Sequence, residues 1–515
     1  MDKNYSYNEK PVIGIDLGTT NSSAAVYDSI SRKAENIKNE EGVSITPSAV
    51  YFESNRKYIV GREAKECAGI YPGYTVLNVK RMMGVTNAAK IIEGISYSPP
   101  QISAMILMKL MKILEMNTNI NSREVIITVP AYFNNAARSA TMAAAEMAGL
   151  QVVTLLDEPV AALYACEQLN DLVNKTVMVF DMGGGTTDIV IAKIDDDTIN
   201  EIVIGGDNQL GGEDYNAALV SYIKETYLKG EELDIEDEQR LLLDVEEVKE
   251  KLSSKEMAYL TLNTAKGKKR IAVTREELEH CTQCLQKRVR KTIQEVTREL
   301  FDKKAHIDKI LLVGGATRMP QIRNLLEEMF PFTDVISKDV DLAVSKGAAI
   351  YGYLKKMEQN TYKVQKVFRP KELVRVSSRS YGIEALKGDD GEKVVCNLIF
   401  KGSELPIKEE RTFHTGEEGQ KKVCLRVYET TASEKYLKPD ADKLLGVYEL
   451  EIDEHIKLHS DIIVELRLKE DGTLHLKARE PQTGAAIQGT INSNALLNDK
   501  EMNQQKEEVE RLILV

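Results

Sequence analysis

The sequence predicts a mixed α/β protein that is followed by an all-β module. Up to about residue 360, apolar strands alternate with helical patterns, which is typical of α/β folds. Within that region two short segments resemble each other, and each carries an aspartate before a glycine-rich turn. From about residue 377 to 493 the pattern changes to strands with turn signals between them.

Length and composition limit the class of protein. The 515 residues suggest two to four folding units at a prior of roughly 150 residues per domain. A net charge of -12 argues against a nucleic-acid partner, because phosphate binding favours a basic surface. The N-terminus lacks the apolar core of a signal peptide. The most apolar segment, 102–116, carries Lys109 and Lys112, so no membrane span is predicted.

The six cysteines are scattered and form no disulfide framework, which indicates a reducing, cytoplasmic protein. Cys281 and Cys284 form a C-x-x-C pair, a weak signal for metal or redox chemistry. Apolar residues at helical spacing favour another interpretation, one amphipathic helix over 274–300 with Cys281 on its buried face.

The two similar segments are 12–21 and 177–188. Each is an apolar strand that ends at an aspartate, Asp16 or Asp181, before a Gly/Thr turn. The residues after the turns, 22–27 and 189–194, have strand patterns. Each turn therefore joins two antiparallel strands, unlike nucleotide-binding turns that open a helix.

These residue types suit a polyphosphate. Glycines let backbone N–H groups approach phosphate oxygens, and threonine hydroxyls add donors. Aspartates at strand ends can hold Mg²⁺ through its water molecules. One such turn alone is equally an ordinary hairpin, but a matched pair favours a clamp on phosphate. The residues concerned are Gly18, Thr19, Thr20, Gly183, Gly184, Gly185 and Thr186.

A third glycine turn supports the pair. Segment 309–320 reads as a strand, the turn Gly314-Gly315, and a helix from Pro320 to about Phe330. A base or ribose can lie against such a turn, with Arg318 available for stacking or for phosphate. A plain strand-to-helix turn is the alternative.

The β-module is predicted from strands such as 422–428 and 462–468, and from Asp471-Gly472 as a hairpin turn. The polar stretch 358–375 reads as a linker. The tail from Asn498 reads as one helix of about four turns, and its terminal apolar residues are expected to pack on the β-module or the preceding domain.

At these motifs the sequence resembles the seventy-kilodalton heat-shock chaperones, the DnaK-like proteins, over nearly its whole length. The matching segments are 15–21, 129–134, 180–188, 210–214 and 313–320. The resemblance implies a two-lobed actin-like ATPase domain (1–357), an interdomain linker (358–376), a β-sandwich peptide-binding domain (377–493) and a partial helical lid (494–515). It implies a slow ATPase with ATP/ADP and Mg²⁺ as cofactors. The implied partners are unfolded polypeptide, a J-domain co-chaperone and a nucleotide-exchange factor.

The resemblance also implies roles for single residues. Lys80 matches the catalytic lysine, Glu158 the glutamate near metal and water, and Asp16 and Asp181 the Mg²⁺ aspartates, with Thr186 and Asp188 beside them. Pro130 and Arg138 match a pair that relays nucleotide state. The matched nucleotide contacts are Gly211, Gly212, Glu246, Lys249, Ser253, Gly314, Gly315, Arg318 and Asp341. The matched peptide-groove residues are Ile383, Leu386, Phe413, Val423 and Leu425, half of which periodicity alone would assign to the core.

Several positions depart from the family pattern. The stretch between Lys80 and Pro130 is short, Glu250 replaces an arginine or apolar residue, and Thr154 replaces an arginine. Charged residues interrupt the apolar linker at 370–376, so we expect weak coupling between the domains. Three other functions stay open: an actin-like filament protein, a sugar kinase of the same fold, and an ATPase whose β-module docks one dedicated partner.

Overall fold

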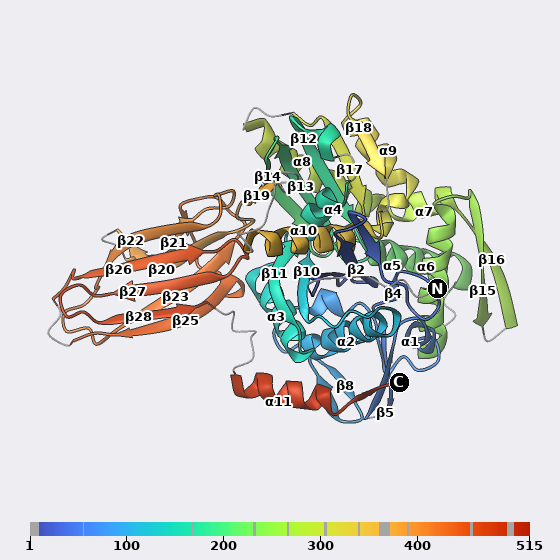
Figure 1. The fold of residues 1–515 in the computed structure, drawn as a ribbon, viewed down its shortest axis with the longest axis horizontal. Helices are drawn as coiled ribbons and strands as arrows, with labels where there is room; N and C mark the ends of the chain where they lie inside the picture. The colour runs from blue at the N-terminus through green and yellow to red at the C-terminus, as the bar shows by residue number, and fades with distance from the viewer. Residues whose placement is uncertain are drawn as a thin grey trace.

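The structure is a computed structural model. It describes residues 10–54, 56–166, 169–229, 233–264, 267–302, 306–337, 340–359, 371–388, 391–453, 457–491 and 499–515. Figure 1 shows a large N-terminal part (residues 10–359) with the β-module (residues 380–491) at its side and the last helix beneath it. Within those ranges, no helix combines the length and the apolar character needed to cross a membrane.

The first sheet of the N-terminal part has six strands in the order β11-β10-β1-β2-β3, with β4 beside β2. β1 pairs antiparallel with β2 and parallel with β10, which pairs parallel with β11. Two helices pack on it around a large apolar core. The bounds are β1 (Ile13–Asp16), β2 (Asn21–Asp28), β3 (Lys33–Asn36), β4 (Thr46–Pro47), β10 (Glu124–Val129), β11 (Gln151–Asp157), α2 (Pro99–Asn117) and α3 (Asn135–Met147).

A smaller lobe of short elements lies against α2. Three of its strands join one strand from the C-terminal segment in a four-stranded sheet, and the other two form a two-stranded sheet. The bounds are β5 (Val50–Ser54), β6 (Lys57–Val60), α1 (Arg62–Cys67), β7 (Thr75–Val76), the 3₁₀ turn η1 (Val79–Met82), β8 (Lys90–Ile92) and β9 (Ile95–Tyr97).

The second sheet repeats the pattern of the first, in the order β18-β17-β12-β13-β14-β19. β12 pairs antiparallel with β13 and parallel with β17. Helices α4 and α10 share one core with strands of both sheets, so they hold the two sheets together. The bounds are α4 (Glu158–Ala165), η2 (Leu169–Leu172), β12 (Lys175–Met182), β13 (Thr187–Ile194), β14 (Thr198–Asp207), β17 (Lys309–Val313), β18 (Asp334–Ser337), α10 (Ala343–Gln359) and β19 (Glu372–Val374).

A helical layer with one hairpin completes the N-terminal part. It comprises α5 (Gly212–Ile223), a π-helical turn (Lys224–Leu228), α6 (Ile235–Leu252), β15 (Met257–Thr264), β16 (Gly267–Thr274), α7 (Arg275–Cys281), α8 (Gln283–Asp302), the 3₁₀ turn η4 (Gly315–Arg318) and α9 (Pro320–Met329). The single helix predicted over 274–300 is wrong, because α7 and α8 are separate helices that meet at Thr282. The Thr282 hydroxyl donates to the Leu278 carbonyl, and such back-bonding bends helices.

The β-module consists of two sheets around one core. The five-stranded sheet runs β24-β21-β20-β23-β25 and the four-stranded sheet β22-β26-β27-β28. The hairpin predicted at Asp471-Gly472 is confirmed between β26 and β27. The bounds are β20 (Ser380–Lys387), β21 (Glu392–Ile399), β22 (Ile407–His414), β23 (Lys422–Thr430), β24 (Tyr436–Leu437), η5 (Ala441–Lys443), β25 (Leu444–Glu451), β26 (Asp461–Leu468), β27 (Leu474–Arg479) and β28 (Ala486–Thr490).

The C-terminal segment returns to the N-terminal part. Helix α11 (Asp499–Glu510) packs on α2 and α3, and strand β29 (Ile513–Leu514) pairs in parallel with β6. The helix has about three turns rather than the four predicted, because the chain leaves the helix to form β29. The predicted cap at Asn498 lies outside the described residues. The expectation that the apolar end packs on a domain is confirmed, since Val509 and Leu512 join the core of the first sheet.

The described part of the linker is also ordered. Residues 360–370 lie outside the described ranges, but β19 adds a short parallel strand to the edge of the second sheet. Arg375, which the sequence suggested would weaken linker docking, is buried beside this strand.

Candidate functional site

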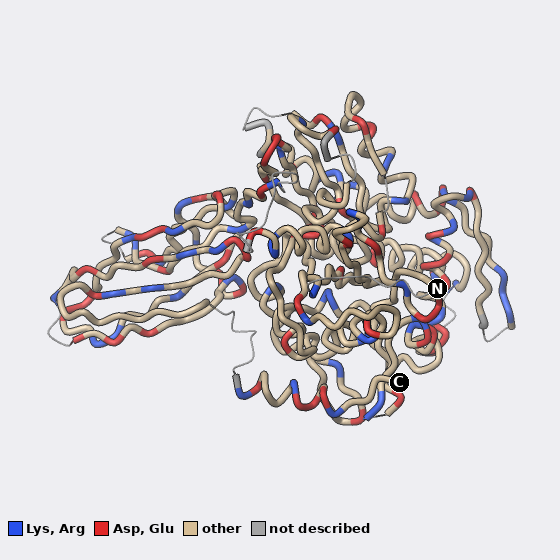
Figure 2. The backbone as a smooth tube through the Cα atoms, viewed as in Figure 1, with Lys and Arg blue, Asp and Glu red and all other residues tan. Residues whose placement is uncertain are grey.

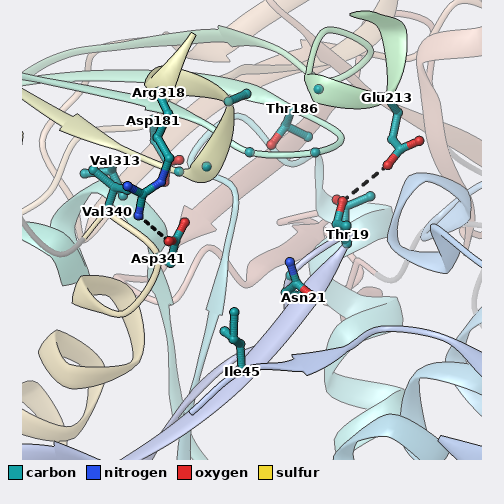
Figure 3. A pocket seen from close by; sticks show the side chains of 18 of the residues that line it. Thr19, Asn21, Ile45, Asp181, Thr186, Glu213, Val313, Arg318, Val340 and Asp341 are labelled. Atoms are coloured by element: carbon teal, nitrogen blue, oxygen red, sulfur yellow. Dashed lines mark hydrogen bonds and ion pairs between the residues drawn. The ribbon is translucent and has the colours of Figure 1, made fainter. Parts of the chain in front are cut away.

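A cavity of about 500 Å³ lies between the two sheets of the N-terminal part. Figure 3 shows its walls: the glycine turns, the threonines beside them, and acidic side chains that face inward. Most of the residues predicted to bind nucleotide line it. They are Asp16, Gly18, Thr19, Thr20, Lys80, Glu158, Asp181, Gly183, Gly184, Thr186, Gly212, Glu246, Lys249, Ser253, Gly314, Gly315, Arg318 and Asp341.

The two similar turns face each other across one end of the cavity. A Cβ atom built on Gly184 would lie 1.9 Å from Thr20 Oγ1, and one built on Gly185 would lie 2.5 Å from Thr19 Oγ1. Only glycine permits this approach. The prediction that each turn joins antiparallel strands is confirmed by the β1–β2 and β12–β13 pairings. The opposed turns present backbone N–H groups and hydroxyls from two sides.

Three predicted residues support the walls instead of lining the cavity. Gly211 packs against the backbone of Gly184, and a Cβ there would meet the Gly184 carbonyl oxygen at 2.6 Å. The carbonyl of Gly185 accepts a hydrogen bond from Arg81 at 3.0 Å. Asp188 is buried directly behind the cavity, where its carboxylate accepts from the Tyr132 backbone N–H at 2.9 Å.

Buried charges meet at the inner end of the cavity. Lys80 donates to Glu158, and Asp16 and Asp188 both lie close enough to Asp181 to contribute to raising its pKa. Burial, reinforced by Glu158, raises the pKa of Asp16 to about 7 and that of Asp188 to about 7. Burial likewise raises the pKa of Asp181. Against the opposing effect of burial, Glu158 and Asp16 raise the pKa of Lys80.

This cluster suits a divalent cation. Desolvated carboxylates that repel one another gain stability when a cation lies between them. Among the described residues, no group of three or more His, Cys, Asp or Glu is arranged to ligate a metal directly. Asp16 and Asp181 both line the cavity, and Mg²⁺ held by them through water stays a prediction.

One face of α6 forms another wall. Four cavity residues project from the same side of this helix and its C-cap: Glu246, Lys249, Glu250 and Ser253. Glu246 precedes the adjacent pair 249–250 by three and four residues, and Ser253 follows that pair by four and three. Lys249 donates to the Gly212 carbonyl at 2.9 Å, and burial lowers the pKa of Lys249. Glu246 pairs with Lys65 at 2.7 Å.

The third glycine turn closes the opposite side. Gly314 has a φ of +82° and approaches the Met182 carbonyl too closely for a Cβ, so glycine is required there. Arg318 pairs with Asp341 at 2.5 Å, as Figure 3 shows. Its guanidinium is thereby fixed beside the cavity.

Sequence reasoning missed some lining residues. Five of them lie within the matching motifs, so their place in a motif could have predicted that they line the cavity. They are Asn21, Glu213, Val313, Ala316 and Met319. Thr20 donates to Glu213 at 3.4 Å. Four other lining residues lie outside those motifs, and only the tertiary fold brings them to the cavity. They are Ser23, Ile45, Val340 and Val344.

Comparison with known sequences assigns the family. The sequence model of a family described as "Hsp70 protein" matches residues 12–94 and 85–513. The chain belongs to the Hsp70 family. It is 34% identical over 505 residues to the chaperone protein DnaK of Thermosipho melanesiensis, covering 96% of this chain and 82% of the relative. It is 32% identical to the DnaK of Buchnera aphidicola (96% and 80%) and 33% to that of Thermosipho africanus (96% and 82%).

The predicted relay residues of this Hsp70 protein lie between the first sheet and the linker. Pro130 directly follows β10, and its carbonyl accepts from the Phe133 N–H at 3.1 Å. Arg138 projects from α3 and donates to Asp157 at 2.6 Å. A Cβ atom built on Gly472 of the β-module would lie 3.4 Å from the Arg138 side chain, so Arg138 lies at the junction with the β-module.

The predicted peptide-groove residues are distributed unevenly. Ile383 and Leu425 are buried in the core of the β-module, and Phe413 and Val423 pack against that core with partial exposure. Leu386 is 61% exposed. Two of the five residues therefore hold core positions, and a groove formed by all five stays a prediction.

The C-x-x-C pair is also explained by packing. Cys281 is partly buried against the core of the helical layer, and burial raises the pKa of the Cys281 thiol to about 11. Cys284 is exposed. Both features agree with the structural interpretation of this pair.

Proposed function

We propose that this Hsp70 protein is a DnaK-like molecular chaperone that hydrolyses Mg-ATP and binds extended apolar segments of unfolded proteins under nucleotide control. The observation that carries the proposal is the pair of opposed glycine turns beside buried Lys80 and Glu158. Acidic and basic residues are interspersed over both parts of the chain in Figure 2, which agrees with a peptide rather than nucleic acid as the partner.

We assign residues 1–357 to a two-lobed actin-like ATPase domain, 358–376 to the linker, 377–493 to a β-sandwich peptide-binding domain and 494–515 to a partial lid. The two sheets with matching strand patterns correspond to the two lobes. The cavity between them holds the nucleotide.

Phosphate binding is assigned to the two turns. Backbone N–H groups of Gly18 and Gly184 donate to phosphate oxygens from opposite sides, and Thr19, Thr20 and Thr186 add hydroxyl donors. Bound Mg²⁺ would neutralise phosphate charge. Asp16 and Asp181 would hold it through water.

Hydrolysis is assigned to the buried charges. Lys80 contacts the terminal phosphate and stabilises the charge that develops there. Glu158 holds the Lys80 ammonium in place and orients the attacking water, and the buried Asp188 carboxylate, which accepts from the Tyr132 N–H, supports the wall behind them. The site positions its substrate and stabilises charge, and it forms no covalent intermediate.

Adenosine is assigned to the wall formed by α6 and the third turn. Lys249, Glu246 and Ser253 lie where ribose hydroxyls would bind, and Arg318 lies where its planar guanidinium can stack on the base. Gly314 and Gly315 let the nucleoside approach the backbone.

Peptide binding is assigned to the β-module. An extended peptide adds backbone hydrogen bonds to strands, and pockets select its apolar side chains. A J-domain co-chaperone and a nucleotide-exchange factor are further proposed partners. The cytoplasmic location stays a prediction that cell fractionation tests.

A peptide-array scan tests this function against its alternative. A chaperone binds many apolar sequences, and ATP lowers their retention. Binding to a single sequence, insensitive to ATP, would instead support an ATPase that docks one dedicated partner. Membership of the Hsp70 family disfavours the filament protein and the sugar kinase.

A further inference from the structure

The linker arginine Arg375 contacts both the first sheet and the β-module. It follows β19, which Figure 1 shows between the second sheet and the β-module. Its guanidinium forms an ion pair with Asp157 at the end of β11. It also donates to the Leu155 carbonyl at 3.5 Å and to the Glu470 carbonyl, in the β26–β27 turn of the β-module, at 2.7 Å.

This arginine is deeply buried. Arg375 is 7% exposed and Asp157 is 2% exposed. Removing one partner of a buried ion pair strongly destabilises the folded arrangement, because the other charge is left buried and uncompensated. The docked linker therefore adds a second buried ion pair to Asp157, beside the one that Arg138 forms from α3.

Asp157 is shared between two guanidinium groups. One carboxylate oxygen accepts from Arg138 at 2.6 Å, and the other accepts from Arg375. Although burial opposes them, Arg138 and Arg375 together lower the pKa of Asp157. Nearby Glu201 accepts from the Val376 N–H at 2.8 Å, which ties the same linker segment to β14.

The position of Asp157 bears directly on hydrolysis. It is the last residue of β11 and the cap of α4, and the next residue is Glu158. The Glu158 carboxylate pairs with Lys80 inside the nucleotide cavity. A displacement of the Asp157 backbone therefore moves the group that holds Lys80.

We propose that Arg375 is a positioning residue for ATP hydrolysis: docked in the linker, it holds Asp157, and through the adjoining Glu158 it aligns Lys80. The proposal rests on the catalytic assignment made above for Lys80 and Glu158. This proposal replaces the expectation that Arg375 weakens docking of the linker. An unpaired buried arginine would oppose docking, but Arg375 is paired with Asp157.

The experiment compares single-turnover hydrolysis by the full chain at saturating ATP, together with ATP affinity and thermal unfolding. In Arg375→Leu we expect the rate to fall about tenfold with ATP affinity within about twofold, because chemistry and not binding is disturbed. Arg375→Lys should recover part of the rate, since an ammonium can still pair with Asp157. Asp157→Asn combined with Arg375→Leu should be no slower than the slower single variant, as expected for residues that act as a unit.

Arg379→Leu is the matched control. Arg379 is at the same junction, where it lies over the Tyr132 ring at 4.0 Å and donates to the Tyr132 carbonyl at 2.7 Å. Its removal should leave the rate within about twofold of wild type. A similar loss in Arg379→Leu would overturn the proposal, because general undocking would then explain the effect.

Two further outcomes separate this proposal from the catalytic assignment. A rate within twofold of wild type in both Arg375→Leu and the near-isosteric Arg375→Gln would overturn the role of Arg375 alone. If Arg375→Leu does not fold, Arg375→Gln and Asp157→Asn decide the question by the same criteria. A wild-type rate in Glu158→Gln would instead overturn the catalytic assignment, and this inference with it.

Discussion

Lys80 and Glu158 form an ion pair inside the cavity, although 78 residues separate them in the sequence. Their side chains are only 7% and 11% exposed. The Lys80 ammonium also lies 5.9 Å from the centre of the Phe133 ring. A lysine held this firmly and shielded from water can stabilise charge strongly, because little reorganisation accompanies the reaction.

Lys80→Ala should retain ATP binding and lose hydrolysis. The lysine stabilises charge that develops in the transition state, so we expect the single-turnover rate to fall by about 100-fold or more, with ATP affinity changed by less than about fivefold. Rapid-quench measurement of ATP cleavage gives the rate. Lys109→Ala removes another buried, paired lysine on α2, outside the cavity, and should hydrolyse normally. Wild-type hydrolysis by Lys80→Ala would exclude the assignment.

The nucleotide-free protein should lose stability as the pH rises. The pKa of Asp16 and of Asp188 is raised to about 7 by burial and by Glu158. A carboxyl whose pKa is raised on folding favours the folded state below its unfolded pKa. That contribution is lost as the pH rises towards 7. The loss is at most about 4 kcal/mol for each group at 1.36 kcal/mol per pH unit.

Thermal unfolding at pH 5.5 and pH 8 in a chelator checks this prediction. Mg·ADP should stabilise the protein more at pH 8, where the carboxylates that suit the cation are ionised. Asp16→Asn, which cannot ionise, should show a shallower pH dependence. An equal effect of Mg·ADP at both pH values would contradict the cation site.

The C-terminal segment should stabilise the N-terminal part. Val509 on α11 is fully buried in the core of the first sheet, so Val509→Ala should lower the free energy of unfolding by about 2 kcal/mol. Ile513 is 57% exposed, and Ile513→Ala, its matched control, should change the free energy by less than about 0.5 kcal/mol. Urea unfolding of both variants measures the difference. Equal effects would mean that α11 does not pack as described.

Peptide release should be fast in both nucleotide states. The described part of the C-terminal segment lies on the N-terminal part and not over the β-module, so it adds no cover to a bound peptide. Affinity differences between related complexes lie mostly in the dissociation rate. Stopped-flow release of a labelled apolar peptide checks this. Dissociation that takes many minutes in ADP alone would show that another element closes over the peptide.

The end of the cavity formed by the two opposed glycine turns could be predicted from the sequence, because its shape depends on local turns. Gly184 cannot be replaced by a larger residue, because a Cβ atom there would clash with Thr20. The similarity of the two turns in the sequence led to the prediction that both contact one ligand. The antiparallel pairings followed from strand patterns on each side of the turns.

Other features depend on partners that are distant in the sequence. Arg375 looked like a charge that disrupts an apolar linker, because Asp157 and Glu470 give no local signal of pairing with it. The break at Thr282 falls in a segment with continuous helical periodicity, so the sequence pattern gave no sign of it. Ile45 and Val340 reach the cavity only through the packing of loops.

The pairing of β29 with β6 joins residues 57–58 to residues 513–514. It covers the edge strand of a sheet whose other strands lie within the first 80 residues, and exposed edges invite pairing between chains. During synthesis this edge stays open, and the core around Val509 stays incomplete, until residues 509–514 have left the ribosome. A protein that is proposed to bind other unfolded chains thus itself exposes an unpaired strand edge during its synthesis, until β29 has formed.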